Sequence, residues 1–66
     1  MRITGTVKYQ DIGMGFWGII GANGEKWLPV NLPEHLKKEG KNVYLKVKEV
    51  KDGVSMFMWG TMVEII

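Results

Sequence analysis

Residues 13–18 read GMGFWG and match G-x-G-x-x-G, the pattern with which dinucleotide-binding enzymes hold a pyrophosphate against a helix N-terminus. That chemistry needs a strand before the pattern and a helix that opens at its last glycine. Here Gly18 is followed by two isoleucines and then by Asn23-Gly24, a dipeptide typical of β-hairpin turns. A chain of 66 residues is also far shorter than a dinucleotide-binding fold requires. We therefore interpret the three glycines as part of a hairpin.

Other groups that could carry out catalysis are sparse. His35 is the only histidine. No second residue is evident that would work with it as a general base or as a metal ligand. Ser55 lies in a predicted strand without the sharp turn that exposes a nucleophile. The seven carboxylates are scattered, and no two of them suggest an acid/base couple. The sequence therefore predicts a protein that is not an enzyme and that uses no cofactor and no metal.

Length and composition favour one small globular domain over residues 1–66. Hydrophobic residues make up 45% of the chain and charged residues 24%, which argues against disorder. The chain contains no cysteine, whereas secreted domains of this size usually need disulfides. No apolar run resembles a signal peptide or reaches transmembrane length. We expect a cytoplasmic protein without a membrane partner.

The first half of the chain reads as three strands. Residues 3–9 alternate apolar and polar side chains, and Gly5 within them suits a bulge or a strong bend. Residues 16–20 and 26–30 flank the Asn23-Gly24 turn. If these two residues are the whole loop, the strands pair so that the sum of partner numbers is 47. The expected pairs are then Ile20 with Trp27, Ile19 with Leu28, Gly18 with Pro29 and Trp17 with Val30.

That register assigns the two faces of the hairpin. Trp17, Ile19, Leu28 and Val30 are expected to face the core. Phe16 and Trp27 then share the opposite face, beside the small or flat Gly18 and Pro29. Either a planar ring stacks on this face, or the helix or the C-terminal strand covers it.

The second half predicts a short helix and two more strands. One or two helical turns are expected between Leu32 and Glu39, capped by Asn31 or the next residue and ended by Gly40 in the left-handed conformation. Apolar residues alternate again over 43–48, Asp52-Gly53 marks a tight turn, and a break at Gly60 divides 54–59 from 61–66. The order predicts an all-β fold: a five-stranded Greek-key barrel of the OB-fold type, with its one short helix between strands 3 and 4.

The opening of the chain resembles that of cold-shock domains. Residues 5–9, GTVKY, match their G-x-V-K-aromatic strand, and residues 15–19, GFWGI, match the glycine- and phenylalanine-rich strand that follows. The resemblance implies single-stranded nucleic acid stacked on Phe16 and Trp27, with Lys8 and Tyr9 as the basic–aromatic pair of the first strand. Gly18 stands where that family has its second aromatic residue, Met14 replaces its leading lysine, and Pro29 replaces its third-strand histidine.

A closer resemblance is to small OB-fold proteins and domains of archaea and bacteria. Their motifs appear here as GFWGI at 15–19, NG at 23–24, NLP at 31–33 and MWG followed by VEI at 58–65. These motifs cover nearly the whole chain. The resemblance implies the fold, and it implies no activity.

Two functions remain open. In the first, the protein is a non-catalytic module that binds another protein or a second copy of itself. Both faces of the predicted strand at 54–59 are apolar, so Met56, Met58 and Trp59 are its candidate contacts. In the second, the protein binds single-stranded nucleic acid weakly. Residues 37–51 carry six lysines and two glutamates, a net charge of +4. Its candidate contacts are Lys8, Tyr9, Phe16, Trp27, Lys46 and Lys48.

Overall fold

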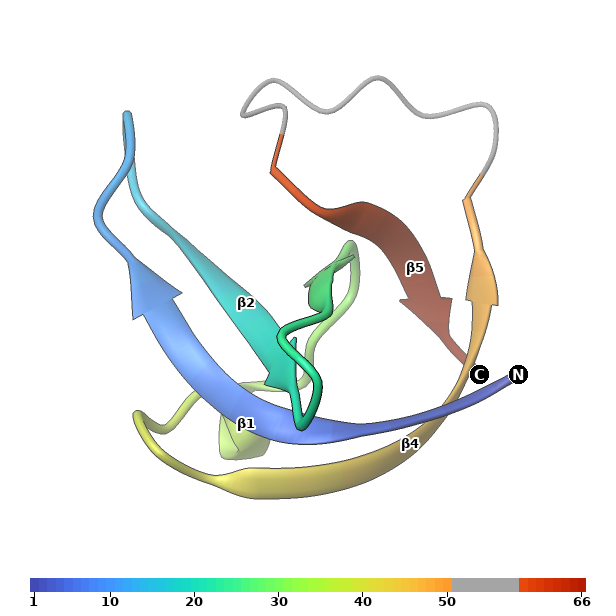
Figure 1. The fold of residues 1–66 in the computed structure, drawn as a ribbon. Helices are drawn as coiled ribbons and strands as arrows, with labels where there is room; N and C mark the ends of the chain where they lie inside the picture. Colours follow the sequence, from blue (N-terminus) through green and yellow to red (C-terminus); the bar gives the residue numbers. More distant parts are fainter. Residues whose placement is uncertain (51–58) are drawn as a thin grey trace.

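The computed structural model describes residues 1–50 and 59–66 of the chain. The expected turn at Asp52-Gly53 and the expected strand up to residue 58 lie outside the described residues. The described residues form five strands (Figure 1): β1 (Arg2–Gln10), β2 (Phe16–Gly21), β3 (Lys26–Pro29), β4 (Asn42–Glu49) and β5 (Thr61–Ile65).

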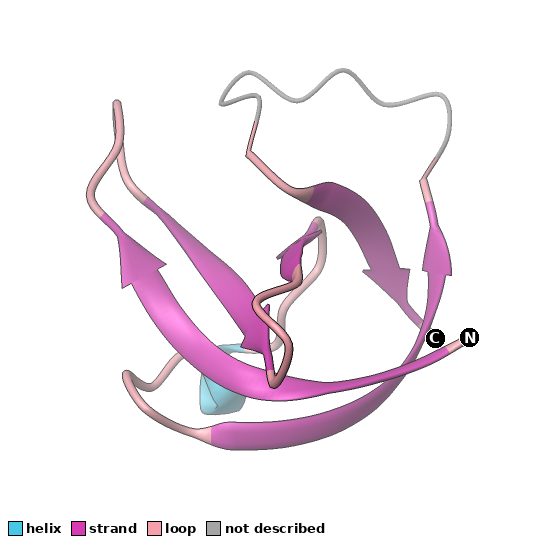
Figure 2. Cartoon of the chain, in the orientation of Figure 1, coloured by secondary structure: helices cyan, strands magenta, loops and turns pink. Residues whose placement is uncertain are grey.

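The strands close into a barrel in the order β1-β2-β3-β5-β4. Strands β3 and β5 run parallel to each other, and every other neighbouring pair is antiparallel. A 3₁₀ turn, η1 (Glu34–Leu36), lies between β3 and β4 in the sequence and at one end of the barrel (Figure 2). The predicted all-β, OB-fold-like barrel with one short helical element is confirmed.

Side chains that alternate along the strands fill the interior. In β1 the buried positions are Ile3, Gly5 and Val7, as the period of two predicts. Leu36 of η1 packs against the same core from the end of the barrel. The buried core cluster consists of Ile3, Val7, Ile19, Leu32, Val43, Val47 and Val63.

The turn between β2 and β3 is one residue longer than expected. The N–H of Gly21 donates to the carbonyl of Glu25 at 2.8 Å, and the N–H of Gly24 donates to the carbonyl of Gly21 at 3.0 Å. The loop therefore consists of residues 22–24. Gly24 has a φ of 84°, which confirms its predicted positive φ. A turn closed by a left-handed glycine is the usual form of a three-residue hairpin loop.

This longer turn overturns the expected hairpin register. Ile19 pairs with Trp27 and not with Leu28. Because side chains alternate along a strand, a shift of one residue moves each residue of β3 to the other face. Trp27 therefore packs against the core, and Leu28 lies on the outer side of the barrel. Val30, expected in the core, is exposed.

Asn31 is not a helix cap. The N-cap position of η1 is Pro33, and no side chain caps the turn. The Asn31 side chain instead reaches β5, where its Oδ1 accepts the N–H of Ile65 at 2.8 Å and its Nδ2 donates to the carbonyl of Ile65 at 3.0 Å. This amide forms the two hydrogen bonds that a neighbouring strand residue would form. It fastens the chain after β3 to the last strand.

The helical element ends earlier than the predicted stop at Gly40. One turn lies between Leu32 and Glu39, as expected, and it stops at Leu36. Gly40 has a φ of 82°, but it lies beyond the end of the turn, and its N–H donates to the carbonyl of Val7 in β1. Residues 39–41 thereby continue the β4 edge alongside β1.

Candidate ligand-binding surfaces

Phe16 and Trp27, expected to form one stacking platform, lie on opposite faces of the β2–β3 hairpin. Trp27 shares the inner face with its partner Ile19 and packs against the core cluster. Phe16 is three positions from Ile19 along β2, so alternation places it on the outer face. The corrected register therefore separates the two rings, and the predicted platform is not assembled.

The place beside Gly18 where a planar ring was expected holds Trp59 of the same chain. A Cβ on Gly18 would overlap the six-membered ring of this indole. Phe16 meets the indole edge-on, with ring centroids 5.3 Å apart and an interplanar angle of 67°. The Nζ of Lys26 lies 5.8 Å from the ring centroid. The outer face of the hairpin thus binds an aromatic ring, and that ring belongs to the protein.

The backbone next to Trp59 is also closely fitted. Gly60 has a φ of 68°, and a Cβ there would lie 2.6 Å from the carbonyl oxygen of Lys26. Gly18 and Gly60 together let the 59–60 segment approach the hairpin. With 8% of its surface exposed, Trp59 offers little area to a partner protein. Met56 and Met58, the other candidate protein contacts, lie outside the described residues.

Lys8 and Tyr9 are neighbours in β1 and point to different sides of the sheet. Tyr9 stands opposite Trp17, meets its ring edge-on at 5.2 Å, and covers the backbone of Gly15. Lys8 lies on the outer face, with its Nζ 3.5 Å from Oε2 of Glu39. The two residues therefore do not act as one basic–aromatic pair.

A continuous polar surface runs along β1 and β4 on the outside of the barrel. We call it the β1–β4 outer face. The strand register places Arg2 beside Lys46, Thr4 beside Tyr44, and Thr6 beside Asn42. Its members are Arg2, Thr4, Thr6 and Lys8 from β1, and Asn42, Tyr44, Lys46 and Lys48 from β4.

Tyr44 is the functional candidate that the sequence reasoning did not select. Its side chain is 68% exposed in the middle of this face, and it is the cross-strand neighbour of Thr4. Lys46 lies two positions along the same strand, on the same side of the sheet. The signal in the sequence was the run of alternate positions 44, 46 and 48, which hold a tyrosine followed by two lysines.

The cations of this face are weakly neutralised. Arg2 and Lys46 are direct cross-strand partners, and within the described residues neither forms an ion pair. Like charges placed opposite each other destabilise a sheet. Lys48 lies 3.8 Å from Glu64, and this pair, like that of Lys8, is exposed to solvent. Exposed pairs of this kind contribute little, so an anionic ligand can displace them.

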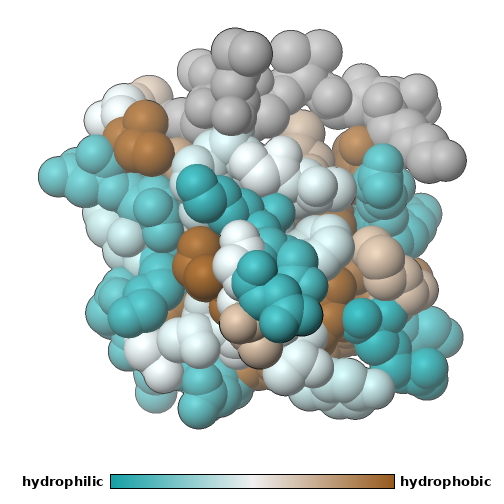
Figure 3. Space-filling view, viewed as in Figure 1, coloured by the Kyte–Doolittle hydropathy of each residue, from teal (hydrophilic) through white to brown (hydrophobic). Residues whose placement is uncertain are grey.

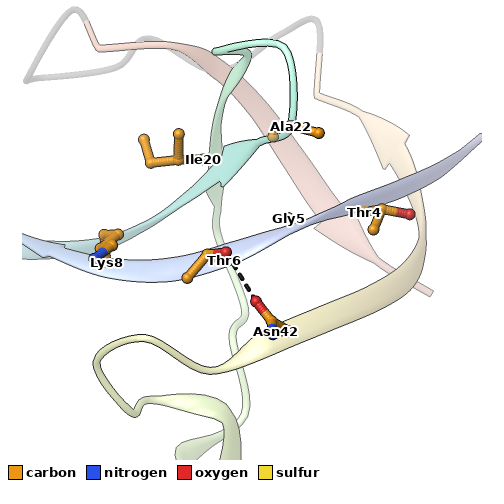
Figure 4. Close-up of a pocket in the computed structure, with 8 residues that line it drawn as sticks. Thr4, Gly5, Thr6, Lys8, Ile20, Ala22 and Asn42 are labelled. Atoms are coloured by element: carbon orange, nitrogen blue, oxygen red, sulfur yellow. Dashed lines mark hydrogen bonds between the residues drawn. The ribbon is translucent and has the colours of Figure 1, made fainter.

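A shallow depression lies on the same face (Figure 4), and its lining includes Thr4 and Asn42, the cross-strand and same-strand neighbours of Tyr44. Its volume is about 360 Å³. The Oγ1 of Thr6 donates to Oδ1 of Asn42 at 2.9 Å across the strands at its edge. The lining residues are Thr4, Gly5, Thr6, Lys8, Ile20, Gly21, Ala22 and Asn42.

The loop between β1 and β2 carries exposed apolar side chains. Met14 is 90% exposed and Ile12 is 44% exposed. Figure 3 shows hydrophobic atoms at this end of the β1–β2 hairpin, whereas the rest of the visible face mixes hydrophilic and hydrophobic residues. Apolar residues gathered at a loop tip are typical of contacts with another protein.

The described residues hold little that resembles a catalytic or metal site. His35 lies on η1 and is exposed. In residues 1–50 and 59–66, no three histidine or carboxylate side chains come close enough to hold a metal ion. Among the same residues, no helix has the length and apolar character to cross a membrane. Ser55 lies outside the described residues.

The chain matches no protein-family model, no curated protein and no solved structure. Its function must therefore be argued from its own surfaces.

Proposed function

We propose that this protein is a small non-catalytic module that binds single-stranded nucleic acid on the β1–β4 outer face. The observation that carries the proposal is Tyr44, exposed over two-thirds of its surface beside Arg2 and Lys46, which form no ion pair within residues 1–50 and 59–66. Single-strand binders combine a basic track for the phosphates with aromatic rings on which bases stack. The proposal includes a cytoplasmic location, which the lack of cysteine in so short a chain supports.

The dimensions of this face suit a short strand. From Lys48 to Lys8 it spans eight residue steps, about 26 Å at about 3.3 Å per residue. Along that path the order is Lys48, then Lys46 with Arg2, then Tyr44, then the depression, and finally Lys8. Cations at both ends and an aromatic ring between them fit a backbone that crosses the face lengthwise.

The test is a titration of a fluorescein-labelled oligothymidylate at low salt, followed by fluorescence anisotropy. Tyr44→Ala is expected to weaken binding by about 1–3 kcal/mol, because one stacked base is lost. Lys46→Ala and Arg2→Ala are expected to flatten the log–log salt dependence by about 0.7 each. Lys38→Ala removes the same charge from the loop after η1 and is the matched control. If Lys38→Ala and Lys46→Ala change the salt dependence of binding equally, this face is not the binding site.

A second candidate function is contact with another protein or with a second copy of the chain. The exposure of Ile12 and Met14 at the β1–β2 loop supports it. It predicts concentration-dependent association in light scattering that Met14→Glu abolishes and Met14→Gln weakens less. A wild-type protein that stays monomeric to millimolar concentration, with no partner contact at this loop, would contradict it.

A further inference from the structure

Two glycines of neighbouring strands line the depression beside Tyr44. Gly5 of β1 stands opposite Gly21 of β2. A Cβ on Gly5 would lie 2.6 Å from the carbonyl oxygen of Ile20, so the two strands approach each other too closely for a side chain there. Strand β1 keeps an unbroken register with both neighbours, so Gly5 permits a bend and not a bulge. The strong curvature of β1 is visible in Figure 1.

The side chains around this bend differ in length, and the difference shapes the surface. Thr4, Thr6 and Ala22 leave the surface low, while Ile20 and Lys8 rise beside it (Figure 4). The result is a concave spot on the barrel wall. The apolar parts of Ile20 and Ala22 can receive the flat face of a ring.

The polar groups at the rim are held in place. Because Thr6 donates its hydroxyl proton to Oδ1 of Asn42, the Asn42 amide is fixed in orientation. Its Nδ2 then carries the two protons that an amide nitrogen donates. Lys8 supplies a positive charge on the side away from Tyr44, and its exposed pair with Glu39 is weak. An apolar floor, an amide donor and a cation together match the ring, the carbonyl or sugar oxygens and the phosphate of a nucleotide.

We propose that this depression is a single-nucleotide subsite, which holds the nucleotide next to the one stacked on Tyr44. The proposal rests on the proposed function and adds where the second base lies. Asn42 lies two positions before Tyr44 on the same face of β4, about 6.6 Å away at about 3.3 Å per residue. The base and sugar lie over Ile20 and Ala22, Asn42 donates to their oxygens, and the phosphate lies at Lys8.

The experiment fills the depression without touching Tyr44 or the cations. Ala22 is exposed in the hairpin turn and lines the depression, so Ala22→Trp occupies the space, and Ala22→Ser is the matched control. The probe is a set of labelled oligothymidylates of equal length, each with one abasic position. In the wild type, two neighbouring abasic positions are expected to weaken binding by about tenfold each, one for each base held.

With Ala22→Trp, we expect intact oligothymidylate to bind about tenfold more weakly and one of the two sensitive positions to become insensitive. Ala22→Ser should keep both. Asn42→Asp is a second variant that preserves shape, removes the amide donor and adds a negative charge to the subsite, and it should also weaken binding. Thermal melting of each variant checks that it is folded.

The outcomes separate the two proposals. Suppose that Tyr44→Ala loses affinity, while Ala22→Trp and Asn42→Asp keep the wild-type affinity and abasic pattern. This result overturns the subsite and leaves the proposed function standing. Wild-type protein that binds no oligothymidylate at low salt overturns both.

Discussion

Trp59 lies with its indole ring against the main chain of Gly18, so closely that a methyl group on Gly18 would overlap the ring. This contact explains why the outer face of the β2–β3 hairpin is as apolar as its inner face. Leu28 and Trp59 are both buried, yet neither belongs to the core cluster inside the barrel. Trp59 lies against Gly18, and the register places Leu28 on the same outer side of the hairpin. The last glycine of GMGFWG is therefore explained by the packing of an aromatic ring.

Gly18→Ala is expected to lower the free energy of unfolding by about 1–3 kcal/mol, because the added methyl group must displace the Trp59 ring. Urea denaturation followed by circular dichroism measures this change. The control is the same substitution in a Trp59→Ala background, where the methyl group meets no ring. The two substitutions should then couple strongly in a double-mutant cycle. An equal cost of Gly18→Ala in both backgrounds would show that the contact is not the reason for the glycine.

Asn31→Ala is expected to destabilise the protein by about 1–2 kcal/mol, because two hydrogen bonds to Ile65 are lost at about 0.5–1.5 kcal/mol each. Hydrogen exchange locates the effect. The amide of Ile65 should lose protection, while the amides of Leu36 and Lys37, which bond within η1, should not. Asn31→Asp keeps the acceptor for the Ile65 amide and should retain part of that protection. Faster exchange confined to η1 would instead support the capping role that the sequence suggested.

The hairpin shows why the barrel was predictable from sequence while its faces were not. Alternation and turn residues identified the strands and their order. The register of β2 with β3 depends on whether the loop has two residues or three, and Asn23-Gly24 is compatible with both. A polar face would have decided between them, but Phe16, Ile20 and Leu28 make the outer side apolar as well. The information that was missing is the position of Trp59, which is distant in the sequence.

The same limit applies to the candidate surface. Lysines at every second position of β4 predicted a basic strand face, and Lys46 and Lys48 do lie on it. That Arg2 stands beside Lys46 follows from the pairing of β1 with β4, which connects residues 36 to 44 positions apart. The role of Asn31 was missed for a similar reason, because its neighbours in the sequence resemble a helix start while its partner is at the other end of the chain.

Gly24→Ala is expected to destabilise the protein by about 1 kcal/mol through backbone strain alone. Its φ is 84°, and nothing lies within 4 Å of a Cβ built there. Chemical synthesis of a 66-residue chain allows a direct control with D-alanine, which adopts positive φ without strain. The D-alanine protein should match or exceed the wild type in denaturation, since its unfolded state is less flexible. Equal destabilisation by both enantiomers would mean that the left-handed turn is not the reason for glycine.

Trp27→Leu and Tyr44→Leu each remove one aromatic ring, but they are expected to have opposite effects on stability and on binding. Trp27→Leu should lower the free energy of unfolding by about 1–3 kcal/mol, because the side chain packs against the core, and should leave oligothymidylate affinity of the folded protein unchanged. Tyr44→Leu should change stability by no more than about 0.5 kcal/mol and cost about 1–3 kcal/mol of binding. Denaturation and anisotropy titration on the same two variants provide both measurements. Weaker binding from Trp27→Leu than from Tyr44→Leu would place the stacked base on the hairpin and not on β4.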